Sequence, residues 1–99
     1  MKRILVTGAD GQLGQCIQKI AKDLVGLEFE FHNSTTLNIT NCDKVSAIFA
    51  KDSFNYCINC AGYTNVEEAE KRPELAYEIN SAAVRKLAET CLAHQVTLI

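Results

Sequence analysis

Three glycines near the amino terminus have a spacing that suits phosphate binding. Gly8, Gly11 and Gly14 recur at intervals of three, directly after the apolar run 3–7 and at the start of a segment with helical periodicity. In such a turn the first glycine lets the chain reverse sharply and the second lets backbone approach a pyrophosphate, while the third lets helix pack closely on strand. Unpaired N–H groups at the helix start bind the phosphates. This placement predicts a dinucleotide-binding turn rather than a merely glycine-rich one.

Strand and helix patterns alternate along the chain around this turn. Short apolar or alternating runs predict strands at 3–7, 27–32, 54–60 and 96–99. Three helices are expected between them, with these residues facing the core: Leu13, Ile17, Ile20 and Leu24 in the first, Val45, Ile48 and Phe49 in the second, and Leu75, Ile79, Ala82, Ala83, Leu87 and Cys91 in the third. This order predicts an α/β fold, a Rossmann-type doubly wound parallel sheet with helices on both faces.

Local signals mark where some of these elements begin and end. Gly26 is a natural stop for the first helix, and Thr40 with Asp43 has the form of a capping box for the second. Thr64 with Glu67 forms another candidate cap. Pro73 suits the first turn of the long third helix. The strand at 27–32 alternates Phe with Glu, which indicates one wetter face at a sheet margin.

Composition narrows the class of protein. With 99 residues and 47% hydrophobic content, the chain predicts one domain, or a portion of one, over 1–99. Ten basic against 12 acidic residues offer no extended positive surface, so neither nucleic acid nor an anionic membrane is an expected partner. No run approaches the roughly 18 apolar residues that cross a bilayer, and the start does not resemble a signal peptide. These features favour a cytoplasmic protein. Because 96–99 begins another apolar strand, we expect the protein to continue beyond Ile99.

The five cysteines fit small core residues in a reducing compartment better than a disulfide framework. Cys57 and Cys60 form a C-x-x-C, but in an extended strand they point to opposite faces about 10 Å apart. That separation is too large for one disulfide or one zinc ion.

Four linked motifs carry a resemblance to a known family. Thr7–Gly14 (TGADGQLG), Leu37–Asn41 (LNITN), Ile58–Glu70 (INCAGYTNVEEAE) and Pro73–Asn80 (PELAYEIN) together closely resemble dTDP-4-dehydrorhamnose reductases, in the extended branch of the short-chain dehydrogenase/reductase superfamily. The resemblance covers essentially the whole chain, although only the cofactor half of such an enzyme is represented.

The resemblance implies NADPH-dependent reduction of the 4-keto group of dTDP-4-dehydro-L-rhamnose to give dTDP-L-rhamnose. It also implies cofactor contacts: Gly8, Asp10, Gly11, Gln12, Leu13 and Gly14 around the pyrophosphate, Asn38 and Ile39 by the adenine, and Cys60, Ala61, Gly62, Tyr63 and Thr64 beside the pyrophosphate and ribose. The residues from Cys60 to Thr64 follow an expected strand at its carboxyl end, where ligands bind in open α/β sheets. The resemblance also allows the protein to form a homo-oligomer.

Several positions depart from the family pattern. Asn38 replaces the usual aspartate, so it is either a weaker adenine acceptor or a simple turn or cap residue. At the tip of the second strand, His32 stands where an NAD-selective site places a carboxylate, so NADPH is favoured, while NADH stays possible. The alternative is that His32 is an ordinary surface residue. Cys16 replaces an acidic residue that some relatives use for a divalent metal, so no metal is expected. Asn80 is either a structural amide or catalytic support, and the acidic turn at 67–70 is expected to be a solvated face.

The expected catalytic pair is missing from these residues. Reductases of this superfamily use a tyrosine proton donor with a lysine four residues later. Here the residues four places after Tyr56, Tyr63 and Tyr77 are Cys60, Glu67 and Ser81. We therefore expect the chemistry beyond Ile99, with no catalytic residue in this chain. A non-catalytic NADP-binding regulatory subunit and a nucleotide-sugar epimerase or dehydratase remain alternatives.

Overall fold

The structure of the chain is a computed structural model that describes residues 2–61 and 73–99; at 73 and 75–80 only the backbone is described. The elements are, in order, β1 (Lys2–Thr7), α1 (Gln12–Ala21), β2 (Leu27–Phe31), α2 (Cys42–Lys51), β3 (Tyr56–Asn59), α4 (Pro73–Ala93) and β4 (Thr97–Leu98). This alternation confirms the predicted element types, and Pro73 opens α4 as expected. The strands at 54–60 and 96–99 are shorter than predicted.

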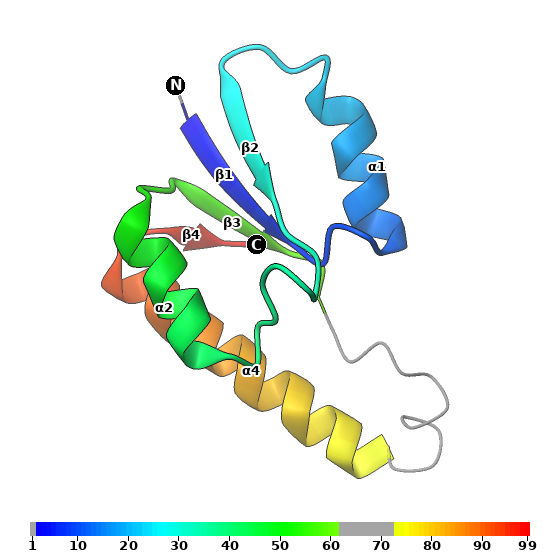
Figure 1. The fold of residues 1–99 in the computed structure, drawn as a ribbon, viewed down its shortest axis with the longest axis vertical. Coiled ribbons are helices and arrows are strands. Elements are labelled where there is room, and N and C mark those ends of the chain that lie inside the picture. Colours follow the sequence, from blue (N-terminus) through cyan, green and yellow to red (C-terminus); the bar gives the residue numbers. More distant parts are fainter. Residues whose placement is uncertain (1, 62–72) are drawn as a thin grey trace.

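The strands form one parallel sheet in the order β2-β1-β3-β4 (Figure 1). In the register of this sheet Ile4 of β1 lies between Phe29 of β2 and Tyr56 of β3. Because β1 is central, its carboxyl end is flanked by the ends of β2 and β3. β2 is an edge strand of the described sheet, which confirms the margin predicted from its alternating Phe and Glu.

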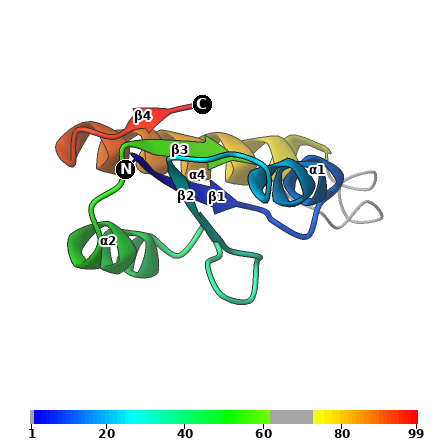
Figure 2. The same ribbon diagram turned by 90° about the horizontal axis from the view of Figure 1, so that it is seen from above.

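Helices cover the two faces of the sheet unequally. On one face, Leu5 and Cys57 pack with residues of α2 and α4 such as Phe49 and Leu87 in a buried cluster. On the other face, the buried cluster is small and joins Ile4, Val6 and Ile17 of α1. α1 and α2 lie on opposite sides of β2 (Figure 2). This arrangement is the Rossmann-type α/β fold predicted from the sequence.

The second helix is capped by a different residue from the one predicted. Asn41 is the N-cap of α2, and its side chain accepts a hydrogen bond from Lys44 N at 3.1 Å. Thr40 instead donates its hydroxyl to Asn38 Oδ1 at 2.7 Å. The capping box of Thr40 and Asp43 is therefore wrong, because the helix begins one residue later than the pattern suggested.

The apolar stripe predicted to face the core from the first helix is only partly buried. Ile17 is buried, but Leu13 is 60% and Ile20 57% exposed, and Leu24 lies beyond the end of α1. Gly14 explains the difference. Because it has no side chain, α1 packs closely on the backbone of the preceding turn, and the side of the helix that carries Gly14 and Ile17 faces the sheet. On α4, Ala83, Leu87 and Cys91 are buried as predicted, whereas Ala82 is exposed.

All five cysteines are free thiols. Cys57 and Cys91 are buried in one cluster, while Cys60 packs on the opposite face of the sheet, as the strand geometry predicted. Cys16 and Cys42 are exposed, so the expectation of core cysteines is wrong for these two. Among the described residues, no helix is long and apolar enough to cross a membrane.

Candidate dinucleotide-binding site

The chain leaves β1 through a sharp turn that only glycine fits at its first position. Gly8 has φ +63°, in the left-handed region that favours glycine. A Cβ at Gly8 would lie 2.5 Å from Ala61 N and from the carbonyl carbon of Cys60. The turn therefore presses against the segment that follows β3, and the role predicted for the first glycine is confirmed.

The other two glycines of the motif differ in what surrounds them. A Cβ at Gly14 would lie 2.5 Å from Gly8 O and 2.6 Å from Ala9 Cα, which confirms that this glycine permits close packing of α1. A Cβ at Gly11 would meet only Gly8 O, at an ordinary 3.4 Å. Gly11 is thus the position of the motif where the chain leaves space. That openness is what close approach of a ligand to backbone requires.

The first turn of α1 is open to an anion. Gly11 is its N-cap and supplies no side-chain hydrogen bond, and the first turn holds no acidic residue. The N–H groups at this end carry the positive end of the helix dipole and favour a negatively charged group. Asp10, Gln12 and Leu13 have exposed side chains around this opening. Of the turn residues expected around a pyrophosphate, those at 10–13 are therefore together and exposed, whereas Gly14 is buried.

Two glutamines of α1 hold the turn in place. Gln18 Nε2 donates to Ala9 O and Gln15 Nε2 donates to Asp10 O, each at 2.8 Å. These bonds tie α1 to the loop that enters it. The sequence does carry a signal for this role, because Gln15 and Gln18 lie one and two turns along the helix from the glycine motif.

A buried polar pair joins the ends of β1 and β3. Thr7 is fully buried, and its hydroxyl donates to Asn59 Oδ1 at 2.6 Å. The same oxygen accepts from Ala61 N at 3.2 Å, and Cys60 N donates to Thr7 O at 3.2 Å. Sequence reasoning missed both residues, although a threonine and an asparagine at the ends of two apolar strands were visible. Together they set the distance between the glycine turn and Cys60–Ala61.

The tip of β2 lies directly beside the glycine turn. His32 N donates to Val6 O and Ala9 N donates to His32 O, both at 2.9 Å. The side chain of His32 is 18% exposed and contacts Glu30 and Thr36. His32 is therefore a half-buried member of a hydrogen-bonded network rather than an ordinary surface residue.

Asn38 serves as a turn residue in the segment that leads to α2. Its Oδ1 accepts from Thr40 N at 3.0 Å as well as from the Thr40 hydroxyl. Asn38 is exposed, whereas neighbouring Ile39 is buried in the cluster beneath α2 and α4. The turn role left open by the sequence is thus present, and the adenine contacts of Asn38 and Ile39 stay a prediction.

Cys60 and Ala61 are half-buried at the carboxyl end of β3, next to Gly8. Burial raises the pKa of the Cys60 thiol, which keeps it neutral. Gly62, Tyr63 and Thr64, expected beside them, lie outside the described residues, as do Glu67, Glu68 and Glu70. Asn80 lies on α4, where its side chain is not described. Cys60 and Ala61 thus follow the carboxyl end of a strand, as expected, and their contact with a cofactor stays a prediction.

The family relationship follows from the whole chain. Residues 1–99 match the family described as RmlD substrate binding domain. The chain belongs to this family. It is 37% identical over 99 residues to dTDP-4-dehydrorhamnose reductase from Aggregatibacter actinomycetemcomitans, a match that covers 100% of this chain and 34% of the relative.

Solved structures of relatives agree with the RmlD family assignment. The crystal structure of a dTDP-4-dehydrorhamnose reductase from Clostridium acetobutylicum superposes with a TM-score of 0.84 at 36% identity, covering 97% of this chain and 34% of that one. The enzyme of the same name from Bacillus anthracis, in complex with NADP, gives a TM-score of 0.83 at 31% identity, covering 99% and 35%. The chain thus spans about a third of the length of these relatives.

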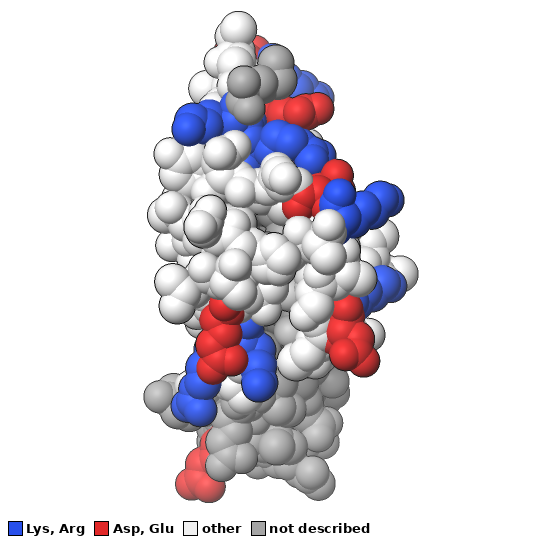
Figure 3. All heavy atoms as spheres, turned by 90° about the vertical axis from the view of Figure 1, so that its left-hand side faces the viewer, with Lys and Arg blue, Asp and Glu red and all other residues white. Residues whose placement is uncertain are grey.

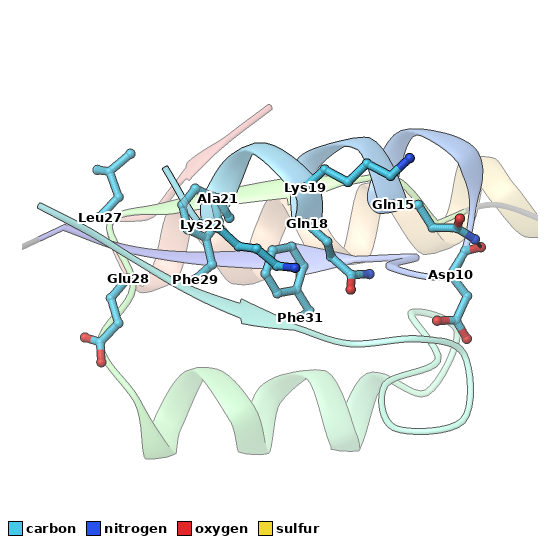
Figure 4. A pocket seen from close by; sticks show the side chains of 10 residues that line it. All are labelled: Asp10, Gln15, Gln18, Lys19, Ala21, Lys22, Leu27, Glu28, Phe29 and Phe31. Atoms are coloured by element: carbon cyan, nitrogen blue, oxygen red, sulfur yellow. Dashed lines mark hydrogen bonds between the residues drawn. The ribbon is translucent and has the colours of Figure 1, made fainter. Parts of the chain in front are cut away.

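A groove of about 780 Å³ in this RmlD family chain lies beside the predicted site (Figure 4). The side chains of Gln18 on α1 and of Lys22, the C-cap residue of this helix, lie beside the rings of Phe29 and Phe31, which stack with centroids 5.6 Å apart. Of the predicted cofactor residues that the structure describes, Asp10 alone lines this groove. It follows the seam between α1 and the edge strand β2, so its size is no evidence for the cofactor site.

Charge is mixed rather than gathered on the face drawn in Figure 3, where basic and acidic side chains alternate. Arg3 alone contacts three carboxylates, those of Glu28, Glu30 and Asp52, at 3.5, 3.6 and 3.1 Å. Pairing of this kind neutralises charge locally. This face therefore carries charge of both signs, and the absence of a nucleic-acid partner stays a prediction.

Proposed function

We propose that the protein containing this chain is an NADPH-dependent reductase that converts the 4-keto group of dTDP-4-dehydro-L-rhamnose to the alcohol of dTDP-L-rhamnose. In this proposal the chain supplies the dinucleotide-binding part. The observation that carries it is the glycine turn: Gly8 and Gly14 are closed in by backbone, whereas Gly11 faces open space beside an uncapped helix start. Relatives named for this reaction, one of them in complex with NADP, support the choice of substrate and cofactor.

The residues of the turn fit a dinucleotide. Backbone around Gly11 and the first turn of α1 would hold the pyrophosphate, with Asp10, Gln12 and Leu13 at its rim. His32 would lie near the adenosine ribose, while Cys60 and Ala61 would bound the site from β3. NADPH supplies a hydride for the ketone when it is bound. The role of this chain is to orient that cofactor and to exclude water around its phosphates.

The described residues do not supply a proton donor for the reduced ketone. Tyr56 is half-buried within β3, and its neighbour four places on is Cys60 rather than a lysine. We expect the tyrosine and lysine in the remainder of the protein. We also propose a cytoplasmic location, since all five cysteines of this chain are free thiols.

Cofactor binding is tested by Gly11→Val in the complete protein. Isothermal titration with NADPH should show tight binding before the substitution and none after it, because the valine side chain fills the space where the pyrophosphate meets backbone. Val25→Ala is the control, since the side chain of Val25 is fully exposed and Val25 lies just before β2, at the end of the strand away from the glycine turn. Equal affinities of Gly11→Val and the parent would refute the site.

Cofactor choice is tested at the tip of β2. His32→Asp places a carboxylate where the 2′-phosphate of NADPH is expected, so the ratio of kcat/KM for NADPH over NADH should fall. An unchanged ratio would show that this strand tip does not face the ribose.

The assignment of the chemistry is tested by assaying NADPH oxidation with dTDP-4-dehydrorhamnose. The complete protein should turn over and the 99-residue chain should not, with circular dichroism showing whether the short chain is folded. Turnover by the folded short chain would contradict the missing proton donor. A complete protein that binds NADPH without turnover would favour the regulatory subunit, or an epimerase or dehydratase acting on another sugar.

A further inference from the structure

Every carbonyl of the turn at 8–11 accepts a hydrogen bond. The first and the last of them accept from backbone N–H groups. The two between them accept from side chains of α1. Gln18 Nε2 donates to Ala9 O at 2.8 Å, and Gln15 Nε2 donates to Asp10 O at 2.8 Å (Figure 4). The direction of the two middle carbonyls therefore depends on two glutamine side chains.

Three N–H groups at the same place have no backbone acceptor. Within the residues that the structure describes, the N–H groups of Asp10, Gln12 and Leu13 donate to no carbonyl. All three residues are exposed. N–H groups without an acceptor at the start of a helix bind anions. The turn thus presents free donors, while its carbonyl oxygens are occupied.

The planarity of the peptide group links these two observations. In a trans peptide the carbonyl oxygen of one residue and the N–H of the next point in opposite directions. The bond from Gln18 that holds Ala9 O towards α1 therefore also determines the direction of the N–H of Asp10. If this peptide rotated, a carbonyl oxygen with its partial negative charge would face the position of the phosphates.

The bond from Gln18 is the better protected of the two glutamine bonds. Gln18 is half-buried and Ala9 is 4% exposed, whereas the bond from Gln15 to Asp10 is exposed. A hydrogen bond shielded from water is stronger, and its loss leaves a buried acceptor without a donor. The peptide that follows Asp10 is also held by its own N–H, which donates within the turn. The peptide between Ala9 and Asp10 has no such second bond in the described structure, so it depends more on its glutamine.

Resting on the proposed function, we propose that Gln18 is a positioning residue for the pyrophosphate of the cofactor. Its amide holds the peptide between Ala9 and Asp10, so the N–H of Asp10 faces the phosphate oxygens and no carbonyl oxygen opposes them. Gln15 holds the next carbonyl and has the smaller effect. Both glutamines act through the backbone of the turn rather than by contact with the cofactor.

Isothermal titration of the complete protein with NADPH and with adenosine 2′-monophosphate tests this role. The second ligand shares the adenosine and the 2′-phosphate but has no pyrophosphate, so it does not need the turn. Gln18→Met keeps the length of the side chain and removes the donor. NADPH should bind about tenfold more weakly to this variant, the scale of one buried acceptor left unpaired, and the affinity for adenosine 2′-monophosphate should stay unchanged.

Steady-state kinetics with dTDP-4-dehydrorhamnose gives a second readout. Gln18→Met should raise the KM for NADPH but leave kcat at saturating NADPH and the KM for the sugar within about twofold. Gln15→Met should weaken NADPH by about threefold, and it carries the test if urea unfolding shows that Gln18→Met does not fold. Cys16→Met is the matched control, because it places the same side chain at an exposed position of α1 without removing an amide.

The possible results separate this role from the proposed function. If the parent binds no NADPH, the proposed function fails and the positioning role fails with it. If the parent binds NADPH and both glutamine variants bind it equally well, only the positioning role fails. Equal weakening of NADPH and adenosine 2′-monophosphate would also overturn the inference, because it would show that Gln18 stabilises the fold rather than the contact with the pyrophosphate.

Discussion

The two faces of the sheet are built for different purposes. Beneath α2 and α4, Leu5, Leu87 and Cys91 are at most 1% exposed and belong to one large apolar cluster. Beneath α1 the buried cluster is small, and α1 itself leaves Leu13 and Ile20 exposed. The sparsely covered face nevertheless carries the helix whose first turn forms the candidate site.

The difference shows where stability and binding reside. The face covered by α2 and α4 buries large side chains, and such burial is the main favourable term in folding. The α1 face is held at its functional end by backbone instead: Gly14 packs on Gly8 and Ala9, and Gln18 bonds to Ala9 O. Substitutions should therefore act mainly on stability on one face, and on turn geometry and binding on the other.

The largest expected loss of stability is on the α2 and α4 face. Leu87→Ala removes a fully buried side chain and should lower the free energy of unfolding by about 3 kcal/mol in urea denaturation. Leu92→Ala on the same helix, where Leu92 is 80% exposed, should change it by less than about 0.5 kcal/mol. Equal losses in the two variants would mean that α4 packs through a different face.

A smaller loss is expected where α1 meets the glycine turn. Gly14→Ala forces a Cβ to within 2.5 Å of Gly8 O, so α1 must shift, at a cost of about 2 kcal/mol. Gly11→Ser places its Cβ in open space and adds a favourable N-cap, so stability should stay within about 0.5 kcal/mol. Thermal and urea unfolding of both variants measure this. If Gly11→Ser were the more damaging substitution, the packing roles of the two glycines would be reversed.

Alkaline pH should weaken the α2 and α4 face by a moderate amount. Burial raises the pKa of the Cys57 and Cys91 thiols in the folded chain, whereas in the unfolded chain a thiol ionises near its ordinary value of about 8.5. The unfolded state therefore loses protons first, and stability, constant below about pH 8, falls as pH rises further. The slope reaches at most about 1.4 kcal/mol per pH unit for each thiol.

Unfolding of the parent by urea between pH 7 and 10 measures this slope, and Cys57→Ala should make it shallower. Cys16→Ala is the control, because Cys16 is exposed. If Cys57→Ala and Cys16→Ala change the slope equally, the loss of stability at alkaline pH does not come from ionisation of a buried thiol.

The smallest effect is expected on the outer side of α1. Ile20→Gln should leave the free energy of unfolding within about 0.5 kcal/mol, because Ile20 is 57% exposed. Ile17→Val, one turn earlier on the buried side, should cost about 1 kcal/mol. If Ile20→Gln lowered the free energy of unfolding in urea more than Ile17→Val, the result would support the helix orientation that the apolar spacing suggested.

Much of the architecture was readable from local patterns. The run 3–7, the alternation of Phe and Glu in 27–31 and the start of α4 at Pro73 each follow from residue types within a few positions. The glycine spacing also predicted the sharp turn at Gly8 and the close packing at Gly14. These features depend on backbone conformation and short-range periodicity, which neighbouring residues determine.

The orientation of α1 and the networks around the turn were decided only by tertiary structure. Leu13, Ile17 and Ile20 share one helical stripe in the sequence, yet contact between Gly14 and Gly8–Ala9 determines which of them is buried. The bond from Thr7 to Asn59 joins residues 52 positions apart, and His32 finds Glu30 and Thr36 only once β2 has ended beside the turn. A periodic pattern shows that a helix has an apolar side, whereas the rotation of that side and the partners of buried polar groups depend on contacts between distant segments.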